Sequence, residues 1–230
     1  LEKNIDYFNN SESYTELNIG IRYSYAKAIL LKFIKEFKNK YKNVKLNVDL
    51  YSKLSLDKVT NKVYDIVIDE EGYIHKLNDV STELLCELNN YFVCGNELFN
   101  SYQNINSIKR LDNAPFISFR PSLKSGKIKK MCFLNDIGFV DVANINESDL
   151  YFCLLENNFG IGLSNELLLN EYLKQGSLQV IDVQEEIFCD RILVAYTKGN
   201  QNVMNFINLL KKFVDEEFQK WNFGIYMMKI

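Results

Sequence analysis

The sequence contains a single histidine, His75, and this scarcity excludes whole classes of functional site. Zinc sites commonly use histidine ligands, and Ser–His or Cys–His catalysis needs a histidine beside the nucleophile. His75 stands in a charged stretch, so we expect it to be a loop residue. The sequence therefore predicts neither a histidine-based zinc site nor a nucleophile–histidine pair.

Other signatures of catalysis are also missing. The chain has no P-loop and no G-x-S-x-G nucleophile elbow, and its one G-x-G, at Gly160–Gly162, follows a predicted helix rather than a strand. The acidic pairs Glu70-Glu71 and Glu185-Glu186 are consecutive, and side chains of neighbouring residues rarely face one another. We expect a binding protein rather than an enzyme, with no catalytic residues, no metal and no cofactor.

The chain also lacks a C-x-x-C motif and long hydrophobic runs. Its five cysteines are dispersed, which suits a reducing cytosol better than a disulfide framework. It contains no run of about 18 apolar residues and no signal peptide at its start. The net charge of -3 predicts poor DNA binding by this segment alone. These features favour a cytoplasmic protein, and they predict buried structural thiols, Cys132 included.

What the chain does contain is a regular alternation of strand and helix patterns. Apolar residues alternate over Leu17–Ile21 and Val44–Leu50, and a compact apolar strand is predicted at Asp65–Asp69. Between them, helical spacing occurs over Leu30–Tyr41 and more briefly over Leu56–Val63. The order β-α-β-α-β is typical of a mostly parallel sheet covered by helices.

A second alternating set follows in the rest of the chain. Strands are predicted at Thr82–Leu88, Tyr91–Cys94, Phe116–Phe119, Phe139–Ala143, Ile161–Leu163, Leu178–Ile181 and Ile187–Tyr196. Helices are predicted at Ser122–Phe133, Glu147–Asn157, Glu166–Lys174, with a stop at Gly176, and from Val203 to near Phe218. We predict an α/β protein with a linker remnant at 1–16, lobe I at 17–94 plus 196–220, lobe II at 95–195 and a tail at 221–230.

Four stretches together resemble the effector-binding domain of LysR-type transcription regulators. Leu17–Ile21 is similar to the family's opening strand, and Asp65–Ile68 stands in the place of its D-L-A-I element. Asn158–Asn165 resembles G-x-G-I-x-x-L-P, and Gly176–Ile181 resembles G-x-L-x-x-I. The resemblance implies two Rossmann-like lobes joined by two crossover strands, as in periplasmic binding proteins of type 2.

The sequence departs from the family pattern in three places. Asn158 replaces the first glycine of G-x-G-I, although asparagine tolerates a left-handed backbone, and Asn165 replaces the following proline. The glycine before D-L-A-I is missing near Lys62 and Val63. These departures bear on the subfamily more than on the fold.

Ligands of α/β lobes lie beyond the carboxyl ends of the strands, where helix N-termini favour anions. Three segments have this position, and they are Ser24–Tyr25, Ser118–Ser122 and Asn144–Ser148. The resemblance implies that Ser24 and the loop at Arg120–Ser122 are effector contacts. Arg120 could form a bidentate pair with a carboxylate, or equally be a surface residue or part of an inter-lobe salt bridge. Ser24 and Ser122 could equally be plain helix caps. The predicted ligand-binding residues are Ser24, Tyr25, Ser118, Arg120, Pro121, Ser122, Asn144, Asn146 and Glu147.

The resemblance also implies partners. It predicts a small effector, a carboxylate or another anion, and DNA contacts made only through a separate N-terminal helix-turn-helix domain. A homodimer is expected, and a tetramer is possible in the full-length protein, with Ile29, Ile34 and Tyr151 as interface candidates unless they belong to the core. An exported solute receptor of the same fold and an enzyme on a two-lobe scaffold remain the alternatives, and no membrane contact is expected.

Overall fold

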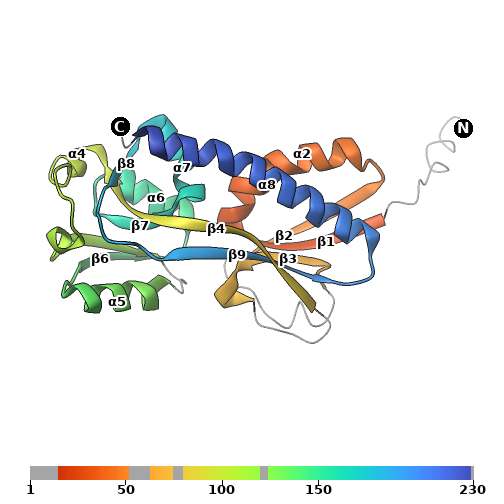
Figure 1. Cartoon of the computed structure of the whole chain (residues 1–230), viewed down its shortest axis with the longest axis horizontal. Helices are drawn as coiled ribbons and strands as arrows, with labels where there is room; N and C mark the ends of the chain where they lie inside the picture. Colours follow the sequence, from red (N-terminus) through yellow and green to blue (C-terminus); the bar gives the residue numbers. More distant parts are fainter. Residues whose placement is uncertain (1–14, 52–62, 75–79, 120–123, 229–230) are drawn as a thin grey trace, which may run out of the picture. The chain divides into compact units, whose positions relative to one another are not determined.

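The computed structural model describes residues 15–51, 63–74, 80–119 and 124–228, which divide into two compact units. Unit 1 consists of the described residues up to Asp69, Tyr73–Leu85 and Leu193–Asp215. Unit 2 consists of Glu70–Gly72, Cys86–Ile192 and the residues from Glu216 on. Strands β4 (Val80–Gly95) and β9 (Cys189–Thr197) contribute residues to both units, so the chain passes between them along these two strands (Figure 1).

Unit 1 is built on three parallel strands in the order β2-β1-β3, with β9 next to β3. These strands are β1 (Thr15–Arg22), β2 (Val44–Tyr51) and β3 (Ile66–Glu70). The apolar residues of the central strand β1, among them Leu17, Ile19 and Ile21, are fully buried. Strand β1 lies between β2 and β3, and its buried apolar residues belong to the core of unit 1, as expected for a parallel strand covered by helices.

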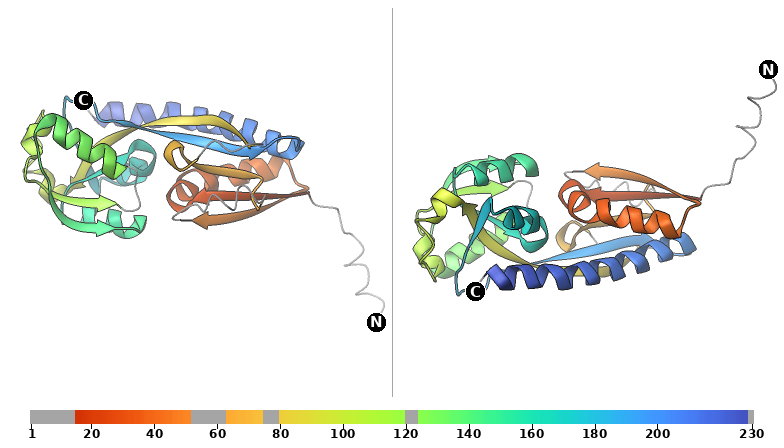
Figure 2. Two further views of the ribbon diagram at one scale, coloured as in Figure 1. Left: turned by 90° about the horizontal axis from the view of Figure 1, so that it is seen from below. Right: turned by 90° about the horizontal axis from the view of Figure 1, so that it is seen from above.

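A continuous helical segment follows β1. It consists of α1 (Tyr23–Tyr25), a π-helical turn η2 (Ala26–Leu30) and α2 (Leu31–Lys40). Phe33 and Phe37 pack their rings against Phe206 of α8 (Gln201–Met228), with ring centroids 4.9 and 5.1 Å apart. The views in Figures 1 and 2 agree with this contact, which covers the sheet of unit 1 with two adjacent helices.

Unit 2 contains a second parallel pair, β5 (Pro115–Phe119) and β6 (Val140–Ile145). A bridge between Phe116 and Ile161 links β5 to the segment leading into β7 (Gly162–Asn165). Strands β7 and β8 (Leu178–Ile181) pair antiparallel with β4. The remaining elements of this part of the chain are η3 (Glu71–Tyr73), α4 (Asn96–Phe99), η4 (Ile108–Leu111), α5 (Lys124–Asn135), α6 (Ser148–Glu156) and α7 (Glu166–Gln175).

The two asparagines that depart from the family pattern both have a clear structural role. Asn158 adopts a left-handed backbone with φ of 64°, as predicted, and its side-chain oxygen accepts a hydrogen bond from Leu98 N at 3.0 Å. Asn165 caps α7 by accepting from Leu168 N at 3.2 Å. The cap hydrogen bond compensates for the missing proline by fixing the start of α7. Gly176, with φ of 70°, ends the helix where predicted.

Strand β4 is one continuous element of 16 residues, so the predicted break between Leu88 and Tyr91 is wrong. The two residues between the predicted strands, Asn89 and Asn90, make hydrogen bonds to other elements. Asn90 is buried and donates to Phe188 O at 2.9 Å, and Asn89 N donates to Glu166 Oε1 at 3.0 Å. Polar residues can therefore continue a buried strand when their hydrogen bonds are made.

The C-terminal helix is longer than its periodicity predicts. It continues to Met228, whereas the apolar spacing predicts an end near Phe218 and no regular structure after Trp221. No proline interrupts this segment, and the helix continues through its glycine, Gly224. His75 and most of the helix predicted over Leu56–Val63 lie outside the described residues, and α5 is described only from Lys124.

Candidate functional site

The carboxyl ends of β1 and β3 bring Arg22 and Asp69 together in unit 1. These strands are parallel, with Ile21 opposite Ile68, so the residues that follow meet at the same edge. Arg22 Nε donates to Asp69 Oδ1 at 2.8 Å, and Arg22 Nη2 donates to Oδ2 at 3.0 Å. The two side chains are 7% and 0% exposed, and the guanidinium lies 4.2 Å from the centre of the Tyr73 ring.

Ser24 lies at the start of the helix that follows β1. Arg22 is the N-cap residue, but its side chain makes no cap hydrogen bond, since its guanidinium is directed at Asp69. Ser24 is half-buried in the first turn, whereas Tyr25 is buried in the core of unit 1. The structure therefore leaves Ser24, rather than Tyr25, in a position to reach a ligand. The π-helical turn η2 begins just after Tyr25, and such turns frequently mark functional sites.

The charges of Arg22 and Asp69 at this edge of the sheet cancel each other. The carboxylate of Asp69 neutralises the guanidinium of Arg22 through two hydrogen bonds. Burial, assisted by the Asp69 carboxylate, raises the pKa of the Tyr51 phenol, which donates a long hydrogen bond of 3.4 Å to Ile68 O. With the charge of Arg22 neutralised, the positive potential that remains at this edge is the partial charge of the helix N-terminus around Ser24.

In unit 2, Ser118 of β5 points towards the neighbouring strand β6. Its hydroxyl donates to Asp141 Oδ1 at 3.0 Å. Asn144, at the end of β6, and Asn146, which follows the strand, are exposed. Glu147 caps α6, because its carboxylate accepts from Asp149 N and Leu150 N at 3.0 and 2.8 Å. This carboxylate stands where a bound anion would lie at the helix start.

The other predicted contacts in unit 2, Arg120, Pro121 and Ser122, lie outside the described residues. Their participation in a site stays a prediction, as does that of Ser24, Ser118, Asn144 and Asn146.

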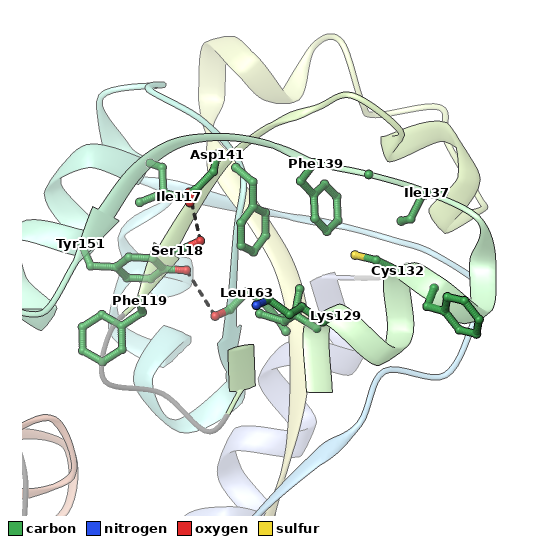
Figure 3. A pocket seen from close by; sticks show the side chains of 14 residues that line it. Ile117, Ser118, Phe119, Lys129, Cys132, Ile137, Phe139, Asp141, Tyr151 and Leu163 are labelled. Carbon is green, nitrogen blue, oxygen red and sulfur yellow. Dashed lines mark hydrogen bonds between the residues drawn. The ribbon is translucent and has the colours of Figure 1, made fainter. Parts of the chain in front are cut away.

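A cavity of about 410 Å³ lies in unit 2, between α5 and the β5–β6 pair. In Figure 3, Tyr151 and Phe119 lie towards one end of this cavity and Cys132 and Ile137 towards the other. Its lining is mostly aromatic and aliphatic, and its polar groups come from Ser118, Lys129, Asp141, Cys132 and Tyr151. The Tyr151 hydroxyl donates to Leu163 O at 3.2 Å. We refer to this space as the α5 cavity.

The three residues predicted at a dimer interface differ in their exposure. Ile29 and Tyr151 are buried in the cores of their own units, at 0% and 3% exposure. Ile34 is half-buried and lines a shallow hollow of about 400 Å³, together with Lys38 of α2 and Lys45, Leu46 and Val48 of β2. Ile34 is therefore the only one of these three with appreciable surface available to a partner.

Three residues that shape these sites were not predicted from the sequence: Arg22, Asp69 and Asp141. Arg22 follows one apolar run predicted as a strand, and Asp69 ends another. Because the two strands are parallel, their ends lie at the same edge, and this position could have identified both residues. Asp141 gave no such signal, because it lies within a strand and reaches Ser118 across it.

Titratable groups elsewhere in unit 2 do not form a metal site. Glu166 is buried at the start of α7, and burial raises its carboxyl pKa above the ordinary value. Within the described ranges, no three His, Cys, Asp or Glu side chains lie close enough to hold a metal ion together.

Among the described helices, none combines the length and apolar composition needed to cross a membrane.

The sequence profile of the LysR substrate binding domain matches residues 11–215. The chain belongs to this family. The regulatory domain of CcmR from Synechocystis, in complex with 2-PG, is similar in structure, with a TM-score of 0.74 at 15% identity over 87% of this chain and 97% of that one. No curated protein sequence is significantly similar to the chain.

Two further LysR-type structures have the same fold. The effector binding domain of QuiR in complex with shikimate gives a TM-score of 0.71 at 14% identity, over 89% of this chain and 99% of that one. The apo regulatory domain of HypT from Salmonella typhimurium gives 0.71 at 13% identity, over 88% and 96%. The fold of this LysR domain is thus the α/β type found in periplasmic binding proteins of type 2, which confirms the predicted fold class.

Proposed function

We propose that this chain is the effector-sensing part of a LysR-type transcription regulator. It binds a small anionic molecule and thereby changes how a linked helix-turn-helix domain binds DNA. The observation that carries this proposal is the helix start after β1, where the N-cap side chain is turned away to Asp69 and Ser24 lies in the first turn. Backbone N–H groups of such a turn, with a serine hydroxyl, bind carboxylates and phosphates.

The family match supports a sensor rather than an enzyme. LysR substrate-binding domains are regulatory, and the related CcmR and QuiR domains have structures with the small ligands 2-PG and shikimate. The regulator is also favoured over an exported solute receptor by the same match. Regulation would follow a population shift, in which the effector favours the arrangement of the units that it binds more tightly.

The first test is a thermal-shift screen of the chain against small carboxylates, amino acids, sulfate and phosphate. A ligand that binds only the folded state stabilises it by about 2.7 kcal/mol at a hundredfold excess over Kd. We expect one class of anion to raise the melting temperature. Ser24→Ala should weaken the affinity for that anion about tenfold or more, because a hydrogen bond to a charged group contributes about 1.5–3 kcal/mol.

Ser177→Ala is the matched control, since this half-buried serine lies after α7 and its hydroxyl donates to Tyr172 O. It should leave the affinity unchanged. Equal affinities in wild type and Ser24→Ala would remove Ser24 from the site. A response to no anion at all would contradict the anionic effector.

The proposed protein partner is a second copy of the chain. Leu31 of α2 and Leu50 of β2 are 72% and 52% exposed, and they lie on the same two elements as the hollow lined by Ile34. Apolar surface of this kind marks association sites. We expect sedimentation velocity to show a dimer that Leu31→Lys weakens, while Asn39→Lys, an exposed change on the same helix, leaves it intact. A monomeric wild type would refute the homodimer.

A further inference from the structure

We propose that the α5 cavity is a binding site for a neutral aromatic molecule that carries one hydrogen-bond donor, as phenol or indole does. The residues that line this site all belong to unit 2, whereas Ser24 belongs to unit 1. The proposal assigns Ser118, which the sequence predicted as an effector contact, to a neutral ligand that differs in charge from the proposed effector.

The volume of the α5 cavity is suited to a ring. It measures about 410 Å³, within the range of about 300–1,000 Å³ typical of small-molecule sites. Packed protein interiors leave few voids larger than a water molecule. A dry cavity of about 150 Å³ already binds benzene in another protein, so this one has room for one or two fused rings.

The lining selects for an aromatic ligand. Phe116 and Phe139 stack with ring centroids 4.6 Å apart, and Phe119 meets Tyr151 edge to face at 5.4 Å. All four rings line the cavity, and Phe133 of α5, which is 84% exposed, also contributes to the lining. Ring faces and edges arranged in this way favour stacked or edge-to-face contacts with a further aromatic ring.

The polar groups select for a neutral donor. The Ser118 hydroxyl donates to Asp141 Oδ1, so it offers a lone pair to the cavity and has no second proton to give (Figure 3). The Asp141 carboxylate only accepts when ionised, and the Tyr151 hydroxyl already donates to Leu163 O. A hydroxyl or indole N–H fits these acceptors. Lys129 and Asp141 both line the cavity, so their opposite charges cancel and leave no net charge to attract a carboxylate or sulfate.

Cys132 provides a direct probe of occupancy. It is half-buried on α5 and lines the cavity, whereas Cys153 is exposed on α6 and is not among the lining residues. We would measure alkylation of both thiols by iodoacetamide in the intact chain with phenol, indole, benzoate or sulfate present. With phenol or indole at ten times Kd, Cys132 should react about tenfold more slowly, because protection follows 1 + [L]/Kd. Cys153 should react at its original rate.

Two variants test the stated chemistry. Ser118→Ala should weaken protection of Cys132 by phenol, while Asp141→Asn, which removes the negative charge, should let benzoate protect Cys132 as well. Equal protection by benzoate and phenol in the wild type would overturn the proposed ligand class. Unchanged Cys132 reactivity with every compound would overturn the site itself. Neither outcome bears on the anionic effector proposed at Ser24, which the thermal-shift screen and Ser24→Ala test separately.

Discussion

Asp69→Ala is expected to lower the free energy of unfolding by about 3–5 kcal/mol, the typical loss when one partner of a buried ion pair is removed. The carboxylate of Asp69 is completely buried and accepts two hydrogen bonds from Arg22. Its removal leaves a buried guanidinium without its counter-charge, and the Tyr73 ring contact cannot replace that charge. Urea denaturation of wild type and variant, followed by circular dichroism, measures the difference.

The matched control is a solvent-exposed ion pair between β1, the strand of Arg22, and β2. Lys45 Nζ donates to Glu16 Oε1 at 2.8 Å, with side chains 55% and 50% exposed. Exposed pairs contribute little, so Glu16→Ala should leave the urea midpoint almost unchanged. The double variant Arg22→Met/Asp69→Leu should recover much of the loss, since it removes both charges. If Asp69→Ala were as mild as Glu16→Ala, the buried pair would not stabilise unit 1.

Gly162→Ala is the second change with a large expected effect, a loss of about 1–3 kcal/mol or more from overpacking. A Cβ at Gly162 would overlap the Tyr151 hydroxyl and lie 2.9 Å from Leu155 Cδ2. Leu155 is fully buried and cannot move away freely, and Tyr151 has room only on the side of the α5 cavity. The displaced hydroxyl would also lose its hydrogen bond to Leu163 O. Urea denaturation gives the size of this effect.

Gly126→Ala makes the same chemical change but should raise the free energy of unfolding instead of lowering it. Gly126 is exposed within α5, and a Cβ there would meet nothing within 4 Å. Alanine favours a helix interior over glycine by roughly 0.5–1 kcal/mol, so this variant should be slightly more stable than the wild type. Gly162→Ala with a similar gain would show that the packing around Tyr151 is loose.

The periodic parts of the fold could be predicted from the sequence because burial leaves a clear pattern in them. The alternation over Leu17–Ile21 and Val44–Leu50 follows from strands packed in one sheet, and the helical spacing of Phe33 and Phe37 follows from their contact with α8. The role of Asn158 could be predicted for a different reason, because a left-handed backbone restricts the choice of residue.

Features that depend on distant partners could not be predicted in this way. The continuity of β4 depends on Glu166 and Phe188, which satisfy Asn89 and Asn90 from other elements. The direction of the Ser118 hydroxyl depends on Asp141, 23 residues further along the chain. The α5 cavity arises where α5 packs over β5 and β6, and local spacing contains no information about space left between elements.

The central claim, that the chain binds a small molecule without transforming it, is tested most directly by calorimetric titration with the best anion from the thermal-shift screen. Nuclear magnetic resonance of the recovered ligand completes the measurement. We predict saturable binding with one molecule per chain, an affinity reduced by Ser24→Ala and a ligand that is chemically unchanged after prolonged incubation. Absence of saturable binding by every anion tested, or conversion of the bound ligand, would contradict this account.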